Sequence, residues 1–286
     1  MAETPFWDTE TTWQSLLALK HRAPDGDGVR RVHRDGARLT LSRGGHWQCR
    51  GARLSQQARE LLNQLAPIAA APCEGFTAAQ IAQSLDARTA TAGAQVDRIT
   101  GDADQIRLHR LRALVDAVIV GATTAIADTP RLTVRAVSGS HPVRVVLDRS
   151  RRLPHDHPLL QDGAAPTYRI VNEREPRDDD TVIAVPGMAP RNILDALADL
   201  GLTRILIEGG GRSVSRFYQA DCLDRLHLVI APVIIGQGPS GLDLPAIDSM
   251  AQAFRPVCHQ YQLGPDVLFD LALDAERPDG PPDPGD

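Results

Sequence analysis

One short segment constrains the fold of this chain more than any other. Residues 205–211 read Ile-Leu-Ile-Glu-Gly-Gly-Gly, and Arg212, Ser213 and Val214 follow. The apolar run predicts a buried strand, and the three glycines predict a tight turn into a helix. Glycines let the backbone approach a ligand closely, and the first turn of a helix offers unpaired N–H groups to an anion. The segment therefore predicts an α/β fold with a ligand at the carboxyl end of a strand, where Glu208 would also point.

Two common glycine motifs do not describe this turn. The dinucleotide-binding pattern G-x-G-x-x-G is not met, because no glycine follows at the required position. Residues 211–215 lack the second glycine of the nucleophile motif G-x-S-x-G. A purely structural role, in which the glycines serve only tight packing, therefore stays open beside the ligand-binding role.

Strand and helix patterns alternate around this segment. Apolar runs predict buried strands at residues 115–120, 143–147 and 226–235. Asp102, followed by Gln105, resembles a capping box that opens a helix through Leu114. Pro190 and Gly201 bracket another helix, whose inward-facing residues are expected to be Ile193, Leu194, Leu197 and Leu200. This alternation predicts a largely parallel sheet covered by helices on both faces.

The length of the chain bears on its domain organisation, and its charge bears on its partners. The chain has 286 residues and a formal net charge of −5. We expect a small N-terminal appendage of unknown role at residues 1–72, with a helix near Trp13 and another from Ser55 to Leu65. The α/β domain is expected at 73–275, and a disordered tail rich in proline and aspartate at 276–286. The acidic balance argues against a nucleic-acid partner.

Other features of the sequence argue against membrane and secreted proteins and against metal or redox sites. No apolar run is long enough to span a membrane, and no secretory signal is visible, so a cytoplasmic protein is expected. Cys49, Cys73, Cys222 and Cys258 are too scattered for a metal or redox motif, and we expect single buried thiols. His155 and His157 favour a solvated loop over a metal site, so no metal is predicted. Lys20 is the only lysine, which leaves arginine as almost the only side chain for gripping phosphate.

Two further segments carry polar residues after predicted strands. Residues 121–135 combine small residues, hydroxyls, Asp128 and two arginines, and residues 80–90 break from a strand into a polar turn. Each is weak evidence alone, since a plain surface loop would have a similar composition. In chain order they stand before the glycine-rich turn, so all three segments are candidates for one site.

Taken in order, these segments resemble the pyrimidine reductases of riboflavin biosynthesis, including the reductase half of the bifunctional deaminase–reductase. The resemblance covers about residues 75–273. It rests on the matching pieces at residues 83–88, 109–118, 127–135, 207–211 and 230–236. The zinc signature of the deaminase half, H-x-E with P-C-x-x-C, is not in this sequence. The resemblance implies a dihydrofolate-reductase-like fold and NADPH-dependent reduction of 5-amino-6-(5-phosphoribosylamino)uracil or a close relative, with hydride delivered to the sugar C1′.

The resemblance also implies which residues bind. The turn from Gly209 through Gly210, Gly211, Arg212, Ser213 and Val214 would hold the cofactor pyrophosphate. Ala82, Thr124 and Asp128 would line its nicotinamide and ribose, and Arg149 would suit the 2′-phosphate of NADPH. Substrate positions fall on Arg112, Leu132, Arg135 and Glu208. Of these, Arg112 and Arg135 are the candidates for the substrate phosphate, and Glu208 for accepting hydrogen bonds from the sugar or pyrimidine.

Several residues depart from the family pattern. Gln80 stands where many members have lysine, Ala87 where the turn usually has glycine, and Thr129 where a second aspartate is common. Val96 and Arg98 replace a common serine and an aromatic residue near the expected cofactor–pyrimidine contact. No proton donor is evident.

Three interpretations therefore remain. The first is the riboflavin-pathway reductase, which would bind a pyrimidine nucleotide-like substrate and form a homodimer, with the run 226–235 as a possible contributor to the interface. The second is a related reductase that acts on another pteridine or pyrimidine in a specialised pathway. The third is a nucleotide-binding regulator without catalysis.

Overall fold

A nine-stranded sheet organises the chain. The computed structural model describes residues 4–20, 22–72, 74–93, 98–174 and 180–273. The strand order is β10-β9-β8-β7-β11-β6-β12-β14-β13. All strands up to β12 pair in parallel, and β14 and β13 add an antiparallel hairpin at one edge. The mostly parallel sheet of the expected fold class is thereby confirmed.

The strands have the following bounds: β6 (Phe76–Gln83), β7 (Ala117–Gly121), β8 (Val143–Leu147), β9 (Thr167–Asn172), β10 (Val182–Val185), β11 (Arg204–Glu208), β12 (Arg225–Ile230), β13 (Val257–Leu263) and β14 (Asp266–Ala272). The helices between them are α3 (Asp102–Leu114), α4 (Ala122–Asp128), α5 (Pro158–Gln161), α6 (Pro190–Ala198) and α7 (Gly211–Gln219).

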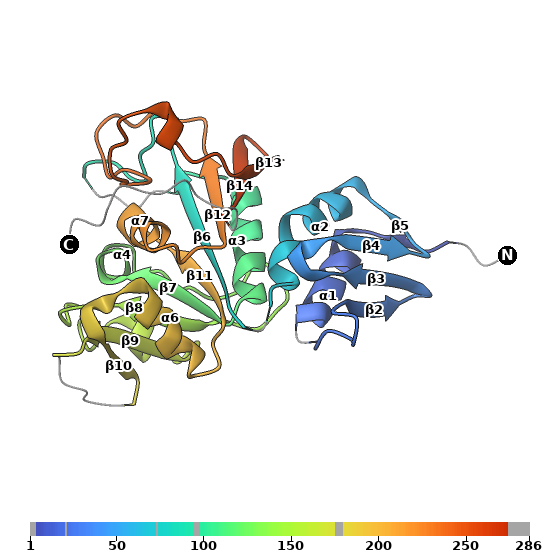
Figure 1. The fold of residues 1–286 in the computed structure, drawn as a ribbon, viewed down its shortest axis with the longest axis horizontal. Helices are drawn as coiled ribbons and strands as arrows, with labels where there is room; N and C mark the ends of the chain where they lie inside the picture. Colours follow the sequence, from blue (N-terminus) through green and yellow to red (C-terminus); the bar gives the residue numbers. More distant parts are fainter. Residues whose placement is uncertain (1–3, 21, 73, 94–97, 175–179, 274–286) are drawn as a thin grey trace.

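Helices cover both faces of the sheet, as Figure 1 shows. On one face, Leu206 of β11 belongs to the same apolar cluster as Leu111 and Leu114 of α3. On the other face, Ile205 belongs to a second cluster with Phe217 of α7. Because neighbouring residues of a strand point to opposite faces, a strand covered on both sides must be apolar throughout. This requirement explains the continuous apolar runs in the sequence.

The N-terminal region lies to one side of the sheet, against α3 (Figure 1). It contains the helices α1 (Thr9–Lys20) and α2 (Gln56–Ala69) and an antiparallel sheet of β2 (Arg30–Arg34), β3 (Ala37–Leu41) and β4 (Trp47–Arg50). The short strands β1 (Phe6–Trp7) and β5 (Arg53–Leu54) pair in parallel. We use "N-terminal region" below for residues 4–72 as far as they are described.

Three sequence expectations about these elements are wrong. Gly101 is the N-cap of α3, and Asp102 is already inside the helix, so there is no capping box. Leu200 lies beyond the end of α6 and is 47% exposed, because the helix stops at Ala198. The strand expected to reach residue 235 ends at Ile230, and the chain then leaves the sheet towards residue 85, whose N–H donates to the Val233 carbonyl at 2.8 Å.

The expectations about the cysteines and about His157 also need correction. Cys222 is buried, but Cys49 is half-buried and Cys258 is exposed, while Cys73 lies outside the described residues. His157 is buried rather than solvated: its Nδ1 accepts from the Leu159 N–H at 3.2 Å, and its Nε2 lies 3.0 Å from the Ala125 carbonyl. The tail expected to be disordered, residues 276–286, lies wholly outside the described residues. In the described part of the chain, every helix is too short or too polar to cross a membrane.

Candidate active site

The predicted segments meet at one edge of the sheet. Because β6, β7, β8 and β11 are parallel neighbours, their carboxyl ends lie side by side, with Glu208 aligned to Gln80 and Gly121 aligned to Leu147. The glycine-rich turn follows β11 at this edge and opens α7. Ligands in such sheets bind where the carboxyl ends of strands leave a crevice. We call the part around the glycine-rich turn the cofactor half and the part around Glu208 and residues 129–141 the substrate half.

The glycine-rich turn requires its glycines for backbone reasons. Gly209 has φ +113°, and a Cβ there would lie 3.2 Å from Val120 Cγ2. A Cβ on Gly211 would collide with the Gly241 carbonyl. At Gly210 the only close neighbour of an added Cβ is Thr124 Oγ1, at 3.3 Å, and this hydroxyl accepts from the Gly210 N–H at 3.2 Å. Close packing thus explains Gly209 and Gly211, whereas Gly210 presents the more open face of the turn.

The other cofactor positions flank this turn. Thr124 comes from α4, which starts where β7 ends, and burial raises the pKa of Asp128 at the last turn of that helix. Arg212 is exposed, Ser213 and Ala82 are half-buried, and the Val214 side chain is buried in the core, which leaves only its backbone available to a ligand.

Two arginines interact electrostatically in this part of the molecule: Arg149, which follows β8, and Arg216 of α7. Arg149 is exposed, and its charge, after the larger effect of desolvation, lowers the pKa of Arg216 on α7. Arg216 is held by a hydrogen bond from its Nη2 to the Met188 carbonyl at 2.8 Å. Guanidinium groups such as these bind a phosphate dianion through charge-assisted hydrogen bonds. The sequence did not predict that Arg149 and Arg216 would influence each other, because the packing of α7 decides this.

The substrate half contains a buried ion pair. Arg112 donates from Nε to Glu208 Oε1 at 2.8 Å and from Nη2 to Oε2 at 2.7 Å, while its Nη1 donates to the Thr133 carbonyl at 3.1 Å. Both side chains are more than nine-tenths buried. This arrangement commits the guanidinium of Arg112 to Glu208, which is one residue before the glycine-rich turn.

Residues 129–135 form the other wall of the substrate half. Leu132 is buried with φ +54°, a left-handed backbone conformation that strains a residue with a Cβ. The Arg135 N–H donates to His109 Nδ1 at 2.9 Å, and the Arg135 side chain donates to Thr133 Oγ1 at 2.8 Å. Burial and the nearby cations Arg112 and Arg135 lower the pKa of His109 to about 4. His109 is therefore a neutral acceptor that fixes the backbone of Arg135.

A pocket of about 510 Å³ opens beside this wall. It is lined by Thr129, Arg131, Thr133, Arg135, His141, Pro158, Asp162 and Ala164. Arg131 and Arg135 are exposed and close enough for the charge of Arg131 to lower the pKa of Arg135, after larger effects of desolvation and Arg112. The His141 Nδ1 accepts from the Val134 N–H at 3.2 Å. Arg131 lies in the matching segment 127–135 but received no role from the sequence, and His141 lies outside every matching segment.

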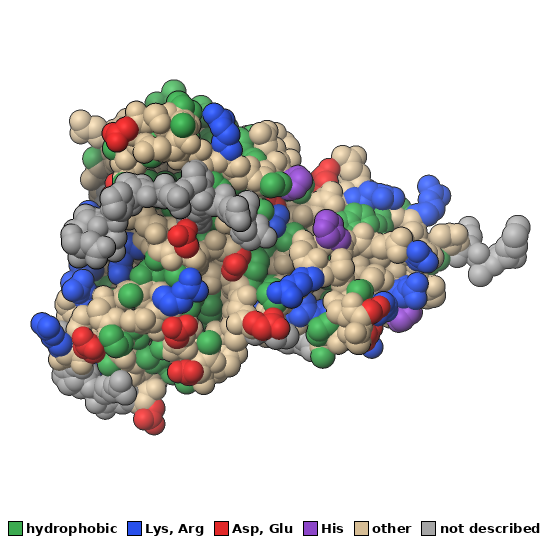
Figure 2. Space-filling model, in the orientation of Figure 1, with side chains coloured by type: hydrophobic (Ala, Val, Ile, Leu, Met, Phe, Trp, Pro, Cys, Tyr) green, Lys and Arg blue, Asp and Glu red, His purple; other side chains and the backbone are tan. Residues whose placement is uncertain are grey.

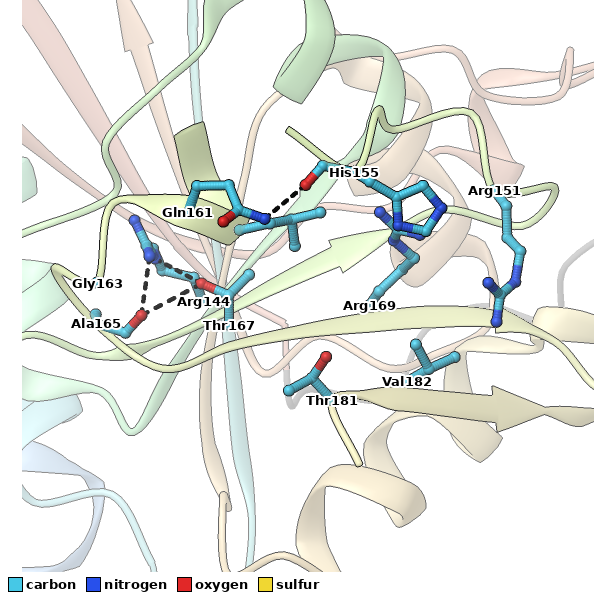
Figure 3. A pocket seen from close by; sticks show the side chains of 11 residues that line it. Arg144, Arg151, His155, Gln161, Gly163, Ala165, Thr167, Arg169, Thr181 and Val182 are labelled. Atoms are coloured by element: carbon cyan, nitrogen blue, oxygen red, sulfur yellow. Dashed lines mark hydrogen bonds between the residues drawn. The ribbon is translucent and has the colours of Figure 1, made fainter. Parts of the chain in front are cut away.

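A second, smaller cavity of about 240 Å³ lies away from this edge, between β8, β9 and the loops around them (Figure 3). Its buried arginines already have partners. Arg144 forms two hydrogen bonds to Asp162, at 2.9 and 2.7 Å, and Arg169 donates to the Leu153 carbonyl at 3.1 Å. We therefore assign it to the support of the β8–β9 edge.

The departures from the family pattern have local explanations. Arg107 of α3 donates to Gln80 Oε1 and lies 2.7 Å, Nη1 to Nδ1, from His227, so a cation from the helix reaches the place where a lysine is common. Ala87 has φ +61°, which is the conformation that glycine adopts without strain. Thr129 has φ +41° at the end of α4. Arg98 is exposed and pairs with Asp102 at 3.4 Å, while Val96 lies outside the described residues.

Charges are mixed over the visible face of the molecule. In Figure 2 acidic and basic side chains are interspersed on the main body, and basic ones are more frequent on the N-terminal region. On this face no continuous basic stripe crosses the part of the main body that the structure describes.

Comparison with known proteins defines the class. The family model described as "RibD C-terminal domain" matches residues 76–269. A "2,5-diamino-6-ribosylamino-4(3H)-pyrimidinone 5′-phosphate reductase" of Methanothermobacter thermautotrophicus is 34% identical over 207 residues, which are 67% of this chain and 95% of the relative. The "Riboflavin biosynthesis protein RibD" of Mycobacterium tuberculosis is 31% identical over 195 residues, 66% of this chain and 52% of the relative.

Solved structures agree with the sequence relatives. The structure titled "Acinetobacter baumannii RibD, form 1" superposes with a TM-score of 0.62 and 28% identity, covering 78% of this chain and 65% of that one. The chain thus spans nearly all of the archaeal relative but only about half of the RibD relative from Mycobacterium tuberculosis. The fold and the site define an α/β protein of the pyrimidine reductase class. The chain belongs to the RibD C-terminal domain family, which confirms the resemblance inferred from its motifs.

Proposed function

We propose that this protein reduces a phosphoribosylamino-pyrimidine with NADPH, opening the ribose to a ribitylamino product in riboflavin biosynthesis. One observation carries the proposal. The chain passes directly from Glu208, which is paired with Arg112 in the substrate half, into Gly209 of the cofactor half. A hydride donor and its acceptor must lie in contact, and a single strand end with a different binding surface on each side meets that requirement. The names of the relatives support the same substrate class.

The residues of the cofactor half fit a nicotinamide dinucleotide. Gly210 offers an open backbone face beside Thr124, at the start of a helix whose first N–H groups favour an anion. Arg149 and Arg216 would bind the 2′-phosphate, and this pair is the reason to propose NADPH rather than NADH. When bound, the nicotinamide supplies the hydride, and the protein contributes position.

In the substrate half we propose different tasks for the two arginines. Because Arg112 is buried and three of its five N–H groups already donate, two of them to Glu208, we assign Arg112 to orienting Glu208 rather than to binding phosphate. Each Glu208 oxygen accepts one bond from Arg112 and retains capacity for a second, which would go to the sugar or the pyrimidine. Arg135, with Arg131 beside it at the pocket, is then the candidate for the substrate phosphate.

The oligomeric state of the protein and its cellular location are also part of this proposal. We retain a homodimer, but not through residues 226–230, because β12 lies inside the sheet between β6 and β14. The edge strands of the sheet are β10 and β13, and on β13 Val257 is 59% exposed. We place the activity in the cytoplasm, where the free thiols Cys49, Cys222 and Cys258 would remain reduced.

Mixing the purified chain with NADPH and 5-amino-6-(5-phosphoribosylamino)uracil tests the proposal. We expect NADPH consumption that depends on the pyrimidine, and a ribitylamino product identified by mass spectrometry. NADPH binding without consumption would reject this substrate and favour either another pteridine or pyrimidine or a non-catalytic role. The absence of NADPH binding would reject the assignment of the cofactor half.

A further inference from the structure

The N-terminal region lies outside the residues that match the family, which begin at Phe76. Its function therefore does not follow from membership. Its contacts, however, are made with particular parts of the substrate half. Two of them, through Lys20 and through Trp13, reach elements that carry Arg112 and Arg135.

Lys20, the only lysine of the chain, binds the end of α3. It is 5% exposed, and its Nζ donates to the carbonyls of Ala113 at 3.1 Å and Val115 at 2.8 Å. The last carbonyls of a helix have no partners within the helix and carry partial negative charge, so a buried ammonium group is well placed there. Arg112 lies in the same last turn. Lys20 thus holds the helix turn that presents Arg112 to Glu208.

Lys20 also accepts a hydrogen bond through its own backbone carbonyl. Arg204, the first residue of β11, donates from Nη1 to the Lys20 carbonyl at 2.8 Å. The strand that starts at Arg204 ends at Glu208. Lys20 is therefore bonded both to the helix that carries Arg112 and to the strand that carries its partner.

Trp13 and Gln14 of α1 bind the segment that follows Arg135. Trp13 Nε1 donates to the Ser138 carbonyl at 3.0 Å, and Gln14 Nε2 donates to Ser138 Oγ at 2.6 Å. The next residue, Gly139, is packed so closely that an added Cβ would lie 2.6 Å from the Ala113 Cβ and 3.6 Å from Leu17 Cδ2. This segment is exposed to solvent on its outer side but contacts both α1 and α3, three residues after Arg135.

Apolar packing makes these contacts part of one core. Trp13 and Leu16 of α1 share a cluster with Leu111 and Leu114 of α3 and with Val134, which precedes Arg135. Burial of such apolar side chains is favourable, so α1 is attached by more than the polar contacts. Figure 1 shows α1 and α2 placed against α3 in this way.

We propose that the N-terminal region is a positioning element of the active site, in which Lys20 and Trp13 fix the geometry of the Arg112–Glu208 pair and of the loop that carries Arg135. The kinetic part of this inference rests on the proposed function. The structural part does not rest on it, since it concerns how rigidly two peptide segments are held in the protein without substrate. Lys20 and Trp13 act through other residues and are not themselves in contact with substrate.

Two matched tryptophan variants test the kinetic part. Trp13→Phe keeps an aromatic side chain in the core and removes the hydrogen bond to Ser138. Trp47→Phe is the control, because Trp47 Nε1 donates to Asn63 Oδ1 at 2.9 Å, entirely within the N-terminal region. We expect Trp13→Phe to raise the KM for the phosphorylated pyrimidine roughly fivefold, the order of one misplaced hydrogen bond, and to leave the KM for NADPH unchanged. The same change in both variants, or an equal change in both KM values, would overturn the proposal.

Amide hydrogen exchange without substrate tests the structural part. In Lys20→Met, which keeps the length of the side chain but not its charge, we expect faster exchange in peptides covering 110–115 and 132–138 than in wild type. Peptides covering 209–216 should exchange at the wild-type rate. Unchanged exchange at 110–115 and 132–138, or an equal rise throughout, would overturn the proposal even if the substrate assignment were correct. If Lys20→Met does not fold, the same comparison between Trp13→Phe and Trp47→Phe decides the question.

Discussion

The two halves of the active site are built in different ways. The cofactor half is formed mainly by the backbone of consecutive residues, from Gly209 to Val214, with Thr124 beside them. The substrate half is formed by side chains from α3, the 129–141 segment and the end of β11, and it is fixed by the buried Arg112–Glu208 pair. Cofactor binding by a backbone turn should depend on the absence of side chains at its glycines. The stability of a half made of buried charges should depend on both partners of each ion pair being present.

The largest effect is expected from breaking the buried pair. Arg112→Met leaves Glu208 without its cation in a site that is more than nine-tenths buried. We expect the free energy of unfolding to fall by about 3–5 kcal/mol, as measured by chemical denaturation. The double variant Arg112→Met with Glu208→Met should recover much of that loss, because no lone charge remains. A loss below about 1 kcal/mol in the single variant would show that water reaches the pair.

Gly210→Asp tests the backbone character of the cofactor half. The new side chain adds bulk and negative charge where the pyrophosphate would lie, next to Thr124 Oγ1. We expect NADPH affinity to fall by roughly a hundredfold or more in a calorimetric titration, the order for an unpaired buried charge. Gly210→Ala adds bulk alone and should have a smaller effect. Unchanged affinity in Gly210→Asp would remove the turn from cofactor binding.

Arg135→Ala tests the division of tasks within the substrate half. We expect the KM for the phosphorylated pyrimidine to rise roughly thirtyfold, as for loss of a charge-assisted contact, while the KM for its dephosphorylated analogue changes little. Arg131→Ala should act in the same direction and less strongly. Equal effects on both compounds would separate Arg135 from phosphate recognition.

Arg149→Ala should narrow the preference for NADPH over NADH by roughly tenfold, because the 2′-phosphate loses one of its two proposed cations. The ratio of kcat/KM values for the two cofactors measures this effect. An unaltered ratio would assign the 2′-phosphate to another group.

The last prediction concerns His109 and the pH dependence of the free energy of unfolding. The folded protein lowers the pKa of His109 from 6.5 to about 4, so between these values the unfolded chain binds a proton that the folded chain does not. The free energy of unfolding should therefore decrease as the pH falls from 6.5 to 4. His109→Asn keeps an acceptor for the Arg135 N–H but does not titrate, and its stability should depend less on pH in this window. Identical slopes for the two proteins would exclude His109 as a source of the dependence.

The same contrast explains what the sequence could predict. The glycine-rich turn and the strand at 143–147 are local patterns, and the structure has them at the expected places. The pairing of Arg112 with Glu208 joins residues 96 positions apart, and the effect of Arg149 on the pKa of Arg216 depends on how α7 packs. The strand expected at 226–235 failed because apolar composition does not show where a chain leaves its sheet. The contacts of Lys20 and Trp13 were equally invisible, since nothing in their neighbourhood forms a motif.

The central claim is that the end of β11 holds the hydride donor on one side and the sugar on the other. Its most direct test uses NADPH that carries deuterium at the transferable position of the nicotinamide. After reaction with 5-amino-6-(5-phosphoribosylamino)uracil, mass spectrometry and NMR locate the label in the product. We predict one deuterium at C1′ of the ribityl chain. A product without deuterium at C1′, or no product while NADPH still binds, would contradict the assignment.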